Sequence, residues 1–485
     1  MSGDTQVSLT ITELGGTDKL YQRVTIGAVP DEVLLDVFNL YLVQALDDDT
    51  WHILVHVCRS WRRIVFASPR RLNLRLLCTP NRLAKNMDVW PSLPIVISNS
   101  LGRTTRAELE DVELMIVALK RHDRICKIDL AVTPILLEKP ILLAMTGSYP
   151  VLTTLRLHES HHWHTINLPV FPDSFFDGFT QHLQELELDR IPFPGLGKLL
   201  LSTSSLVKLR LFNIPRSGYI SPEVIVTCLS TLTRLQCLSL QFQYPQSQAD
   251  RARRRPLTVP HIVLPALNTL QFQGDSNYLE DTVSQIDAPR LKSLNITFFD
   301  QSVFETPLLR HFISRTEKFH ALHRASLVFG SSGIFVILFP PKGMADHGWL
   351  MLEVRCRESA RRFSSLVQVC GSSLPPLPTL ERLHTRGYQS TVQPHMEITG
   401  CVKLLRLFTF LKNLDLSGEL VPHVAIALKE LARESVTEVL PALQNIFVDG
   451  RSASEHVKED IEQFVAARQL SGFPVVVHYR EEGGG

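Results

Sequence analysis

Apolar and polar positions alternate in short segments that recur along most of the chain. Each copy has an apolar residue, usually leucine, at its first, fourth and sixth positions. Clear copies begin at Leu152, Leu183, Leu206, Leu235, Leu267, Leu291 and Leu411, and weaker or doubtful ones lie at Ile125, Leu322, Leu380 and Leu443 and near Trp349. The fourth and sixth positions are two residues apart, so in a strand both side chains point to one face. The pattern predicts a series of short β-strands, each with one apolar face.

Helix signals separate these predicted strands. Ser221 and Pro222 suit the N-cap and first position of a helix, and Thr306 precedes a second proline-led apolar stripe. A helix over 455–469 and a final strand over 473–477 would cap the series. Successive clear copies from Leu152 to Leu291 begin between 23 and 32 residues apart, a period typical of solenoids. We therefore predict an α/β fold in which stacked strand-helix units bury a continuous core.

The amino-terminal part carries two further predicted helices with large apolar faces. The first starts at Pro30, and its apolar positions recur at helical spacing in Val33, Val37, Leu40 and Tyr41. The second carries Leu54, Val57, Cys58, Trp61 and Ile64. Two short helices of this kind cannot cover so much apolar surface alone. We expect a partner set of helices to cover them.

Both ends of this segment resemble the F-box, the helical module that docks on the Skp-family adaptor of cullin-RING ubiquitin ligases. The start reads Val29-Pro30-Asp31-Glu32-Val33-Leu34, and the end reads Val57-Cys58-Arg59-Ser60-Trp61-Arg62. Val29 replaces the usual leucine, and Asp47-Asp48-Asp49 lengthens the loop between the helices. The resemblance implies adaptor contacts through Pro30, Leu34, Val37, Phe38, Leu54, Val57, Cys58, Trp61 and Ile64. An ordinary helical hairpin buried in its own domain is the alternative.

The repeated strands, placed after such a segment, resemble the leucine-rich repeats of fungal F-box proteins. The resemblance implies a small all-α F-box followed by an irregular horseshoe solenoid with parallel strands on its concave face. We predict a disordered start over 1–25, the F-box over 26–75, a helical linker or cap over 76–124, the solenoid with its C-terminal cap over 125–480, and a disordered tail over 481–485. Residues 334–376 break the rhythm and are expected to form an insertion.

The polar positions of the predicted strands would line that concave surface. One predicted strand carries Glu185 and Glu187, and the next carries Lys208 and Arg210. The favoured interpretation is that Glu185 pairs with Lys208 and Glu187 with Arg210 across the two strands. Recognition of a charged target segment is the alternative. The candidate target-binding residues are Arg210, Gln241, Gln271, Asn295, Arg382, His384 and Arg386.

Composition narrows the expected partners and location. The net charge of the 485-residue chain is +1, so no global field attracts it to nucleic acid or to a membrane surface. The longest apolar run, Ile334 to Phe339, is far shorter than the ~20 residues that span a bilayer. The eight cysteines form no Cys-x-x-Cys pair, which favours reduced thiols. We expect a cytoplasmic or nuclear protein with neither membrane nor nucleic-acid partners.

Two clusters suggest other chemistry. His161, His162 and His164 invite a metal site, but they lack partners at zinc-ligand spacing, which favours a surface loop. The basic run Arg251 to Arg255 suggests nuclear import or nucleic-acid contact, yet a solvated loop is favoured. No phosphate loop or nucleophile elbow is present, so neither an enzyme nor a cofactor is expected.

The F-box resemblance implies a substrate-recognition subunit of an SCF-type ubiquitin ligase, acting in ubiquitin-dependent protein degradation. It would bind the Skp-family adaptor, and through it a cullin, and it would hold an unidentified target protein. Two alternatives stay open: a leucine-rich-repeat scaffold without a ubiquitin role, and a metal-binding or enzymatic repeat protein.

Overall fold

The computed structural model divides the chain into two compact units, residues 1–76 and 77–485. The boundary lies one residue from the predicted end of the F-box-like segment. The structure describes residues 26, 29–44, 50–78, 93–99, 115–132, 144–159, 170–171, 181–246, 261–329, 333–341, 343, 348–356, 361–387, 398–434, 438–450 and 454–480. The predicted disordered ends, the loop insert Asp47–Asp49, the histidine cluster and the run Arg251 to Arg255 lie outside the described residues.

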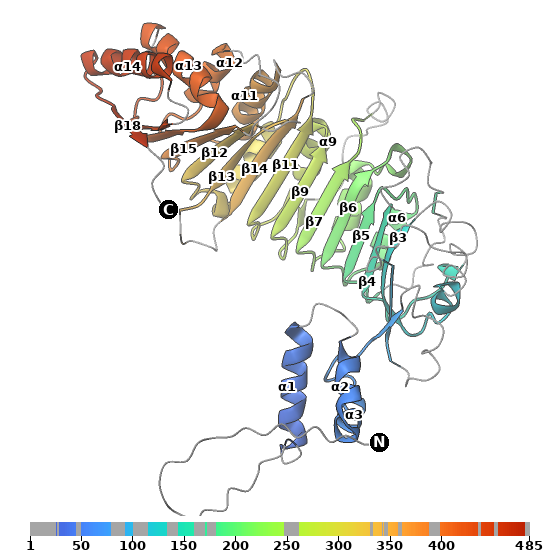
Figure 1. The fold of residues 1–485 in the computed structure, drawn as a ribbon. Helices are drawn as coiled ribbons and strands as arrows, with labels where there is room; N and C mark the ends of the chain where they lie inside the picture. The colour runs from blue at the N-terminus through green and yellow to red at the C-terminus, as the bar shows by residue number, and fades with distance from the viewer. Residues whose placement is uncertain are drawn as a thin grey trace, which may run out of the picture. The chain divides into compact units, whose positions relative to one another are not determined.

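The first unit is helical. It contains α1 (Asp31–Gln44), α2 (Trp51–Val57) and α3 (Arg59–Ala67), all drawn in blue in Figure 1. The second predicted helix is therefore two helices, because Cys58 adopts an extended backbone between them. The Cys58 Sγ accepts a hydrogen bond from the Trp61 backbone N–H at 3.5 Å and caps the start of α3.

Aromatic packing and a few polar contacts hold these helices together. The ring of Phe38 on α1 lies 4.6 Å from that of Trp61 on α3, measured between centroids. The indole N–H of Trp51 donates to the Arg75 carbonyl at 2.7 Å. Arg63 on α3 pairs with Asp31 on α1 at 3.1 Å. The core of this small unit therefore depends on large aromatic side chains, each of which buries much apolar area.

The second unit contains a 16-stranded, mostly parallel sheet within the described residues, in the order β1-β2-β3-β4-β5-β6-β7-β9-β11-β14-β13-β12-β15-β16-β17-β18 (Figure 1). The strands are β1 (Leu76–Cys78), β2 (Ile95–Ser98), β3 (Ile125–Val132), β4 (Thr154–Glu159), β5 (Glu185–Asp189), β6 (Lys208–Ile214), β7 (Cys237–Phe242), β9 (Thr269–Gly274), β11 (Ser293–Phe299), β12 (Arg324–Phe329), β13 (Ile334–Phe339), β14 (Trp349–Arg355), β15 (Arg382–Gly387), β16 (Asn413–Leu416), β17 (Asn445–Asp449) and β18 (Val476–Arg480). Every predicted copy of the apolar pattern contains or directly precedes a strand.

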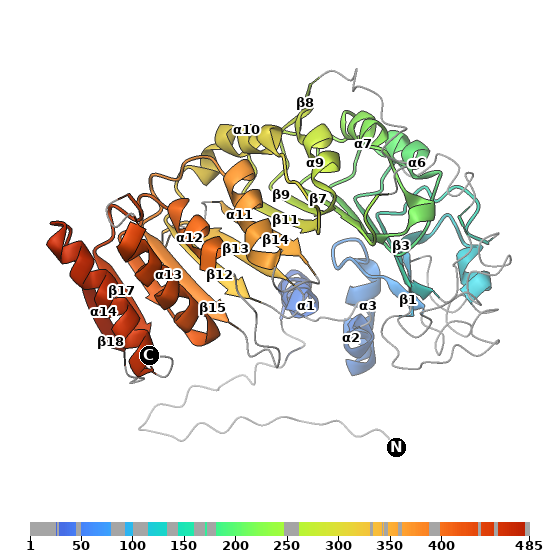
Figure 2. The ribbon, with the colours of Figure 1, turned by 90° about the horizontal axis from the view of Figure 1, so that it is seen from above.

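Helices connect many of these strands and pack on one another in chain order from α6 to α14. They are α6 (Leu196–Ser202), α7 (Pro222–Leu229), α9 (Ser276–Val283), α10 (Pro307–Arg315), α11 (Arg362–Ser373), α12 (Ile398–Arg406), α13 (Val421–Glu434) and α14 (Glu455–Leu470). Figure 2 shows α6, α7, α9 and α10 along the outer side of the curved sheet. A separate parallel pair joins β8 (Ile262–Val263) to β10 (Ile286–Asp287).

The predicted helix starts are present, with one difference in how they are capped. The Ser221 hydroxyl accepts a bond from the Val224 N–H at 3.4 Å, as an N-cap serine should. Thr306 makes no such bond at the start of α10. The Glu280 carboxylate instead accepts from the Leu308 and Leu309 N–H groups at 2.9 and 2.7 Å. A residue of the neighbouring helix α9 therefore caps the start of α10.

The parallel register aligns the predicted leucines in continuous rows. One row runs Leu155, Leu186, Leu209, Leu238, Leu270 and Leu294, which are direct neighbours across successive strands. None of these six side chains is more than 2% exposed. Burying a leucine fully contributes roughly 1.5–3 kcal/mol, so such rows are the main apolar stabilisation of the sheet.

The irregular stretch after residue 322 lies within the sheet. β12, β13 and β14 form an antiparallel meander, and β14 then pairs in parallel with β11 while β12 pairs in parallel with β15. The doubtful copy near Trp349 is thus a full strand. The predicted insertion over 334–376 instead supplies β13, β14 and α11 to the fold, because the alternating Ile334–Phe339 run is itself a strand with one buried face.

The prediction of a helical linker over 76–124 is wrong for much of its described part. Leu76–Cys78 and Ile95–Ser98 form strands β1 and β2, and only residues 115–119 are helical. The physical reason is visible in the sequence, since Ile95, Val96 and Ile97 are β-branched and favour a strand. All four residues of β2 are buried.

Candidate functional site

Helix α1 presents an apolar face to solvent. Val33, Val37, Leu40 and Tyr41 lie on this face, and their side chains are 40–62% exposed. The opposite side of the helix, with Leu34, Leu35 and Phe38, is buried. The apolar residues that the sequence analysis placed at helical spacing are therefore the exposed ones. The buried residues Leu34, Leu35 and Phe38 lie between them in the sequence. An apolar face of this kind is typical of a surface that a partner covers.

The nine predicted adaptor-binding residues divide between exposed and buried positions. Leu34, Phe38, Leu54 and Ile64 are buried within the chain, and Trp61 is half-buried against Phe38. Pro30, Val37, Val57 and Cys58 are exposed. Ile53 on α2 is 58% exposed and was not among the predicted contacts, although it lies four residues before Val57. A partner would thus meet the exposed subset, which Val33, Leu40, Tyr41 and Ile53 extend.

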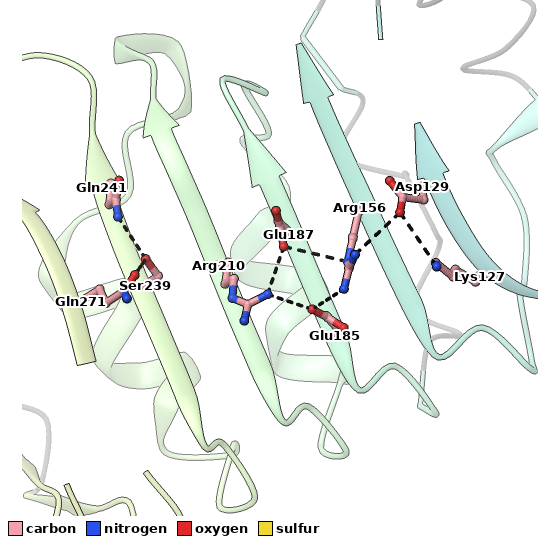
Figure 3. A network of polar contacts seen from close by, with 9 residues as sticks. All are labelled: Lys127, Asp129, Arg156, Glu185, Glu187, Arg210, Ser239, Gln241 and Gln271. Carbon is pink, nitrogen blue, oxygen red and sulfur yellow. Dashed lines mark hydrogen bonds and ion pairs between the residues drawn. The ribbon is translucent and has the colours of Figure 1, made fainter. Parts of the chain in front are cut away.

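A network of charges crosses strands β3 to β6 on one face of the sheet (Figure 3). The Glu185 carboxylate accepts from the guanidinium groups of both Arg156 and Arg210 at 3.0 Å. Arg210 also donates to Glu187 at 3.2 Å, and Arg156 lies 3.7 Å from Asp129. The register places Glu185 opposite Lys208 and Glu187 opposite Arg210, as the favoured interpretation requires. However, the ion pairs of Glu185 are with the two arginines rather than with Lys208.

This network satisfies its own charges, so it stabilises the sheet more than it offers free binding groups. The carboxylates are largely shielded, with side-chain exposures of 13% for Glu185 and 14% for Asp129. Arg156 and Arg210 are about one-third exposed. The sequence analysis placed Arg210 among the target-binding residues. In the structure its guanidinium group already pairs with the carboxylates of Glu185 and Glu187. Asp129 was missed, since its part in the network depends on β3 lying beside β4.

Changing Glu185 to glutamine is expected to lower the free energy of unfolding by about 1 kcal/mol, because two charge-assisted hydrogen bonds weaken at a partly exposed site. Chemical denaturation followed by circular dichroism measures this change. Glu305→Gln, at an exposed position outside the network, is the control and should change little. Equal effects of the two substitutions would contradict the structural role of the network.

Beside the network, the middle strands carry neutral polar side chains. The Ser239 hydroxyl on β7 donates to the Gln271 side-chain oxygen on β9 at 3.1 Å, and Gln241 donates to Ser239 at 3.5 Å (Figure 3). Asn295 follows on β11, directly opposite Gln271 in the register. The predicted residues Gln241, Gln271 and Asn295 therefore lie on three successive strands and form a neutral surface suited to hydrogen bonding.

A cavity of about 690 Å³ opens farther along the same sheet. It is lined by Arg324, Ala325, Ser326, Val328, Phe335, Ile337, Phe339, Met351, Arg382, His384, Arg386, Asp415 and Arg480. Of the seven predicted target-binding residues, it brings together Arg382, His384 and Arg386. Arg210, Gln241, Gln271 and Asn295 do not line it. Sequence reasoning missed Arg324 and Arg480, which come from strands 58 residues before and 98 residues after Arg382.

Among its described lining residues, the cavity has four arginines and one carboxylate, that of Asp415. Asp415 lies 3.5 Å from both Arg382 and Arg480. Arg386 donates from Nε to the Nε2 atom of His384 at 2.8 Å. Burial, and then the nearby Arg386 guanidinium, lower the pKa of His384. His384 therefore accepts this bond as a neutral ring, and the positive charge of the cavity comes from its arginines.

Among the described residues, no three His, Cys, Asp or Glu side chains are grouped as metal ligands. The described helices include none with the length and apolar character of a bilayer span. All eight cysteines are free thiols. Comparison with protein-family models and with curated protein sequences finds no match to this chain.

Proposed function

We propose that this chain is the substrate-recognition subunit of an SCF-type cullin-RING ubiquitin ligase. In this proposal residues 26–75 are an F-box that docks on a Skp-family adaptor. The sheet and its helices are an irregular leucine-rich-repeat solenoid whose polar strand face binds a target protein. The chain itself makes and breaks no bonds, and it acts in the cytoplasm or nucleus.

The observation that carries the proposal is the exposed apolar face of α1. A soluble helix normally turns such a stripe toward its own core. Here Val33, Val37 and Leu40 face outward while α1 also buries a second apolar side in its own unit. Surface of this kind is stabilised when an apolar groove of a partner covers it. The F-box resemblance names the partner that would do so.

The second unit supports the target-binding half of the proposal. Parallel strands that alternate with helices, with leucines aligned in rows, are the features of a leucine-rich-repeat array. Such arrays leave an extended strand face for recognition. A target held there would be brought close to the ubiquitin carrier of the ligase, and proximity with orientation raises transfer rates without any catalytic group on the receptor.

Co-purification of the full chain with a Skp-family adaptor and a cullin tests the proposal. We expect a stable complex of all three proteins in size-exclusion chromatography. Failure of the adaptor to co-elute would contradict the proposal. A complex with the adaptor that excludes the cullin would instead favour the alternative of a scaffold without a ubiquitin role.

A further inference from the structure

We propose that the cavity on the part of the sheet from β14 to β18 binds an acidic segment of the target protein that carries one large apolar side chain. This inference rests on the proposed function, because it names the chemistry of the target that the second unit would hold.

Positive charge in the cavity exceeds what the described residues neutralise. Four arginines line it, and Asp415 is the one described carboxylate among the lining groups. The Asp415 carboxylate pairs with both Arg382 and Arg480. Among the described residues, Arg324 and Arg386 have no carboxylate within 4.0 Å, and their hydrogen bonds go to the Pro340 carbonyl and to His384. The Arg324 guanidinium donates to the Pro340 carbonyl at 3.5 Å and lies 5.9 Å from the centroid of the Phe339 ring. Carboxylates of a ligand would accept strong, charge-assisted hydrogen bonds from the guanidinium groups of Arg324 and Arg386.

The floor of the cavity is apolar. Phe335 and Ile337 on β13 and Met351 on β14 line it, and they reach this face because the antiparallel meander places two extra strands between β11 and β12. Phe335 and Ile337 are half-buried, so each leaves apolar surface in contact with solvent. A ligand group that covers this floor must itself be apolar. One aromatic or large aliphatic side chain meets that requirement.

Several features favour a peptide over a single small anion. The basic groups come from three strands, β12, β15 and β18, so one carboxylate cannot engage them all. The side chains of Arg382 and Arg480 are 43% and 59% exposed, so a chain lying across the cavity can reach them. An extended segment with carboxylates next to an apolar residue matches these basic groups, because they lie to one side of the apolar side chains on β13 and β14.

Fluorescence anisotropy of the full chain with a labelled peptide, in which two glutamates stand on each side of one phenylalanine, tests this inference. We expect saturable binding that weakens as salt rises. Replacing the glutamates by glutamines, or the phenylalanine by alanine, should each reduce affinity about tenfold or more, as should Arg386→Gln or Arg324→Gln in the protein. Arg310→Gln, an exposed arginine on α10, is the matched control and should leave binding unchanged.

The inference would be overturned by equal affinity for the glutamate and glutamine peptides, by no saturable binding of the acidic peptide, or by an equal loss with Arg310→Gln. Phenylacetate that bound as tightly as the peptide would also overturn it, because one ring and one carboxylate would then suffice. Adaptor co-purification is measured separately. Its success together with failed peptide binding would refute this inference alone, and the reverse outcome would refute the proposed function.

Discussion

Changing both Val37 and Val57 to glutamate is expected to reduce the affinity for a Skp-family adaptor by at least about 100-fold, which corresponds to about 2.7 kcal/mol. These valines are 52% and 55% exposed, so the free protein can hydrate the new carboxylates. In the complex the same carboxylates would be buried unpaired in an apolar contact, which is strongly unfavourable. Isothermal titration calorimetry with purified adaptor measures the change.

The control for this double variant is Val303→Glu, because Val303 is 59% exposed and lies in the second unit. It should bind the adaptor as the unchanged chain does. The thermal unfolding of both variants should stay close to that of the parent, since surface substitutions usually change stability by about 0.5 kcal/mol or less. If the Val37/Val57 double variant binds the adaptor with full affinity while remaining folded, the assignment of these residues to the adaptor contact is wrong.

Truncating Leu238 to alanine is expected to lower the free energy of unfolding of the second unit by about 2–5 kcal/mol. Leu238 is 0% exposed and lies between Leu209 and Leu270 in the leucine row. The substitution leaves a cavity that strands fixed on both sides cannot easily close. Urea denaturation followed by circular dichroism measures the loss.

Leu470→Ala provides the comparison for this loss, because Leu470 at the end of α14 is 90% exposed. It should change the free energy of unfolding by about 0.5 kcal/mol or less. A Leu238→Ala variant as stable as Leu470→Ala would mean that the leucine rows do not form the core described here.

The candidate interaction surfaces were only partly predictable from the sequence. Helical spacing identified Val37 as part of an apolar stripe, but both sides of α1 are apolar, and spacing alone does not say which side faces its own unit. The packing of Trp61 against Phe38 decides this question. It places Phe38 in the core and leaves Val37 at the surface. Residues assigned together by resemblance therefore separate into a structural and an exposed set.

The cavity shows a similar division. Arg382, His384 and Arg386 alternate within one strand, so the sequence correctly placed them on one face. Arg324 and Phe335 join them only because β12 pairs with β15 and β13 pairs with β12. Arg480 joins them because β16, β17 and β18 pair in turn beyond β15. Local patterns in these strands are nearly the same, and no local signal says which strand edges will pair.

By itself, the sequence determined the strands that carry the repeated leucine pattern, their apolar faces and the starts of several helices, because these follow from side-chain periodicity and from local capping chemistry. The tertiary structure alone decided the strand order through β14, β13 and β12, the break at Cys58, and which of several apolar stripes stay exposed. These features depend on contacts between residues far apart in the chain, whose free energies are set by packing and register rather than by the identity of neighbouring residues.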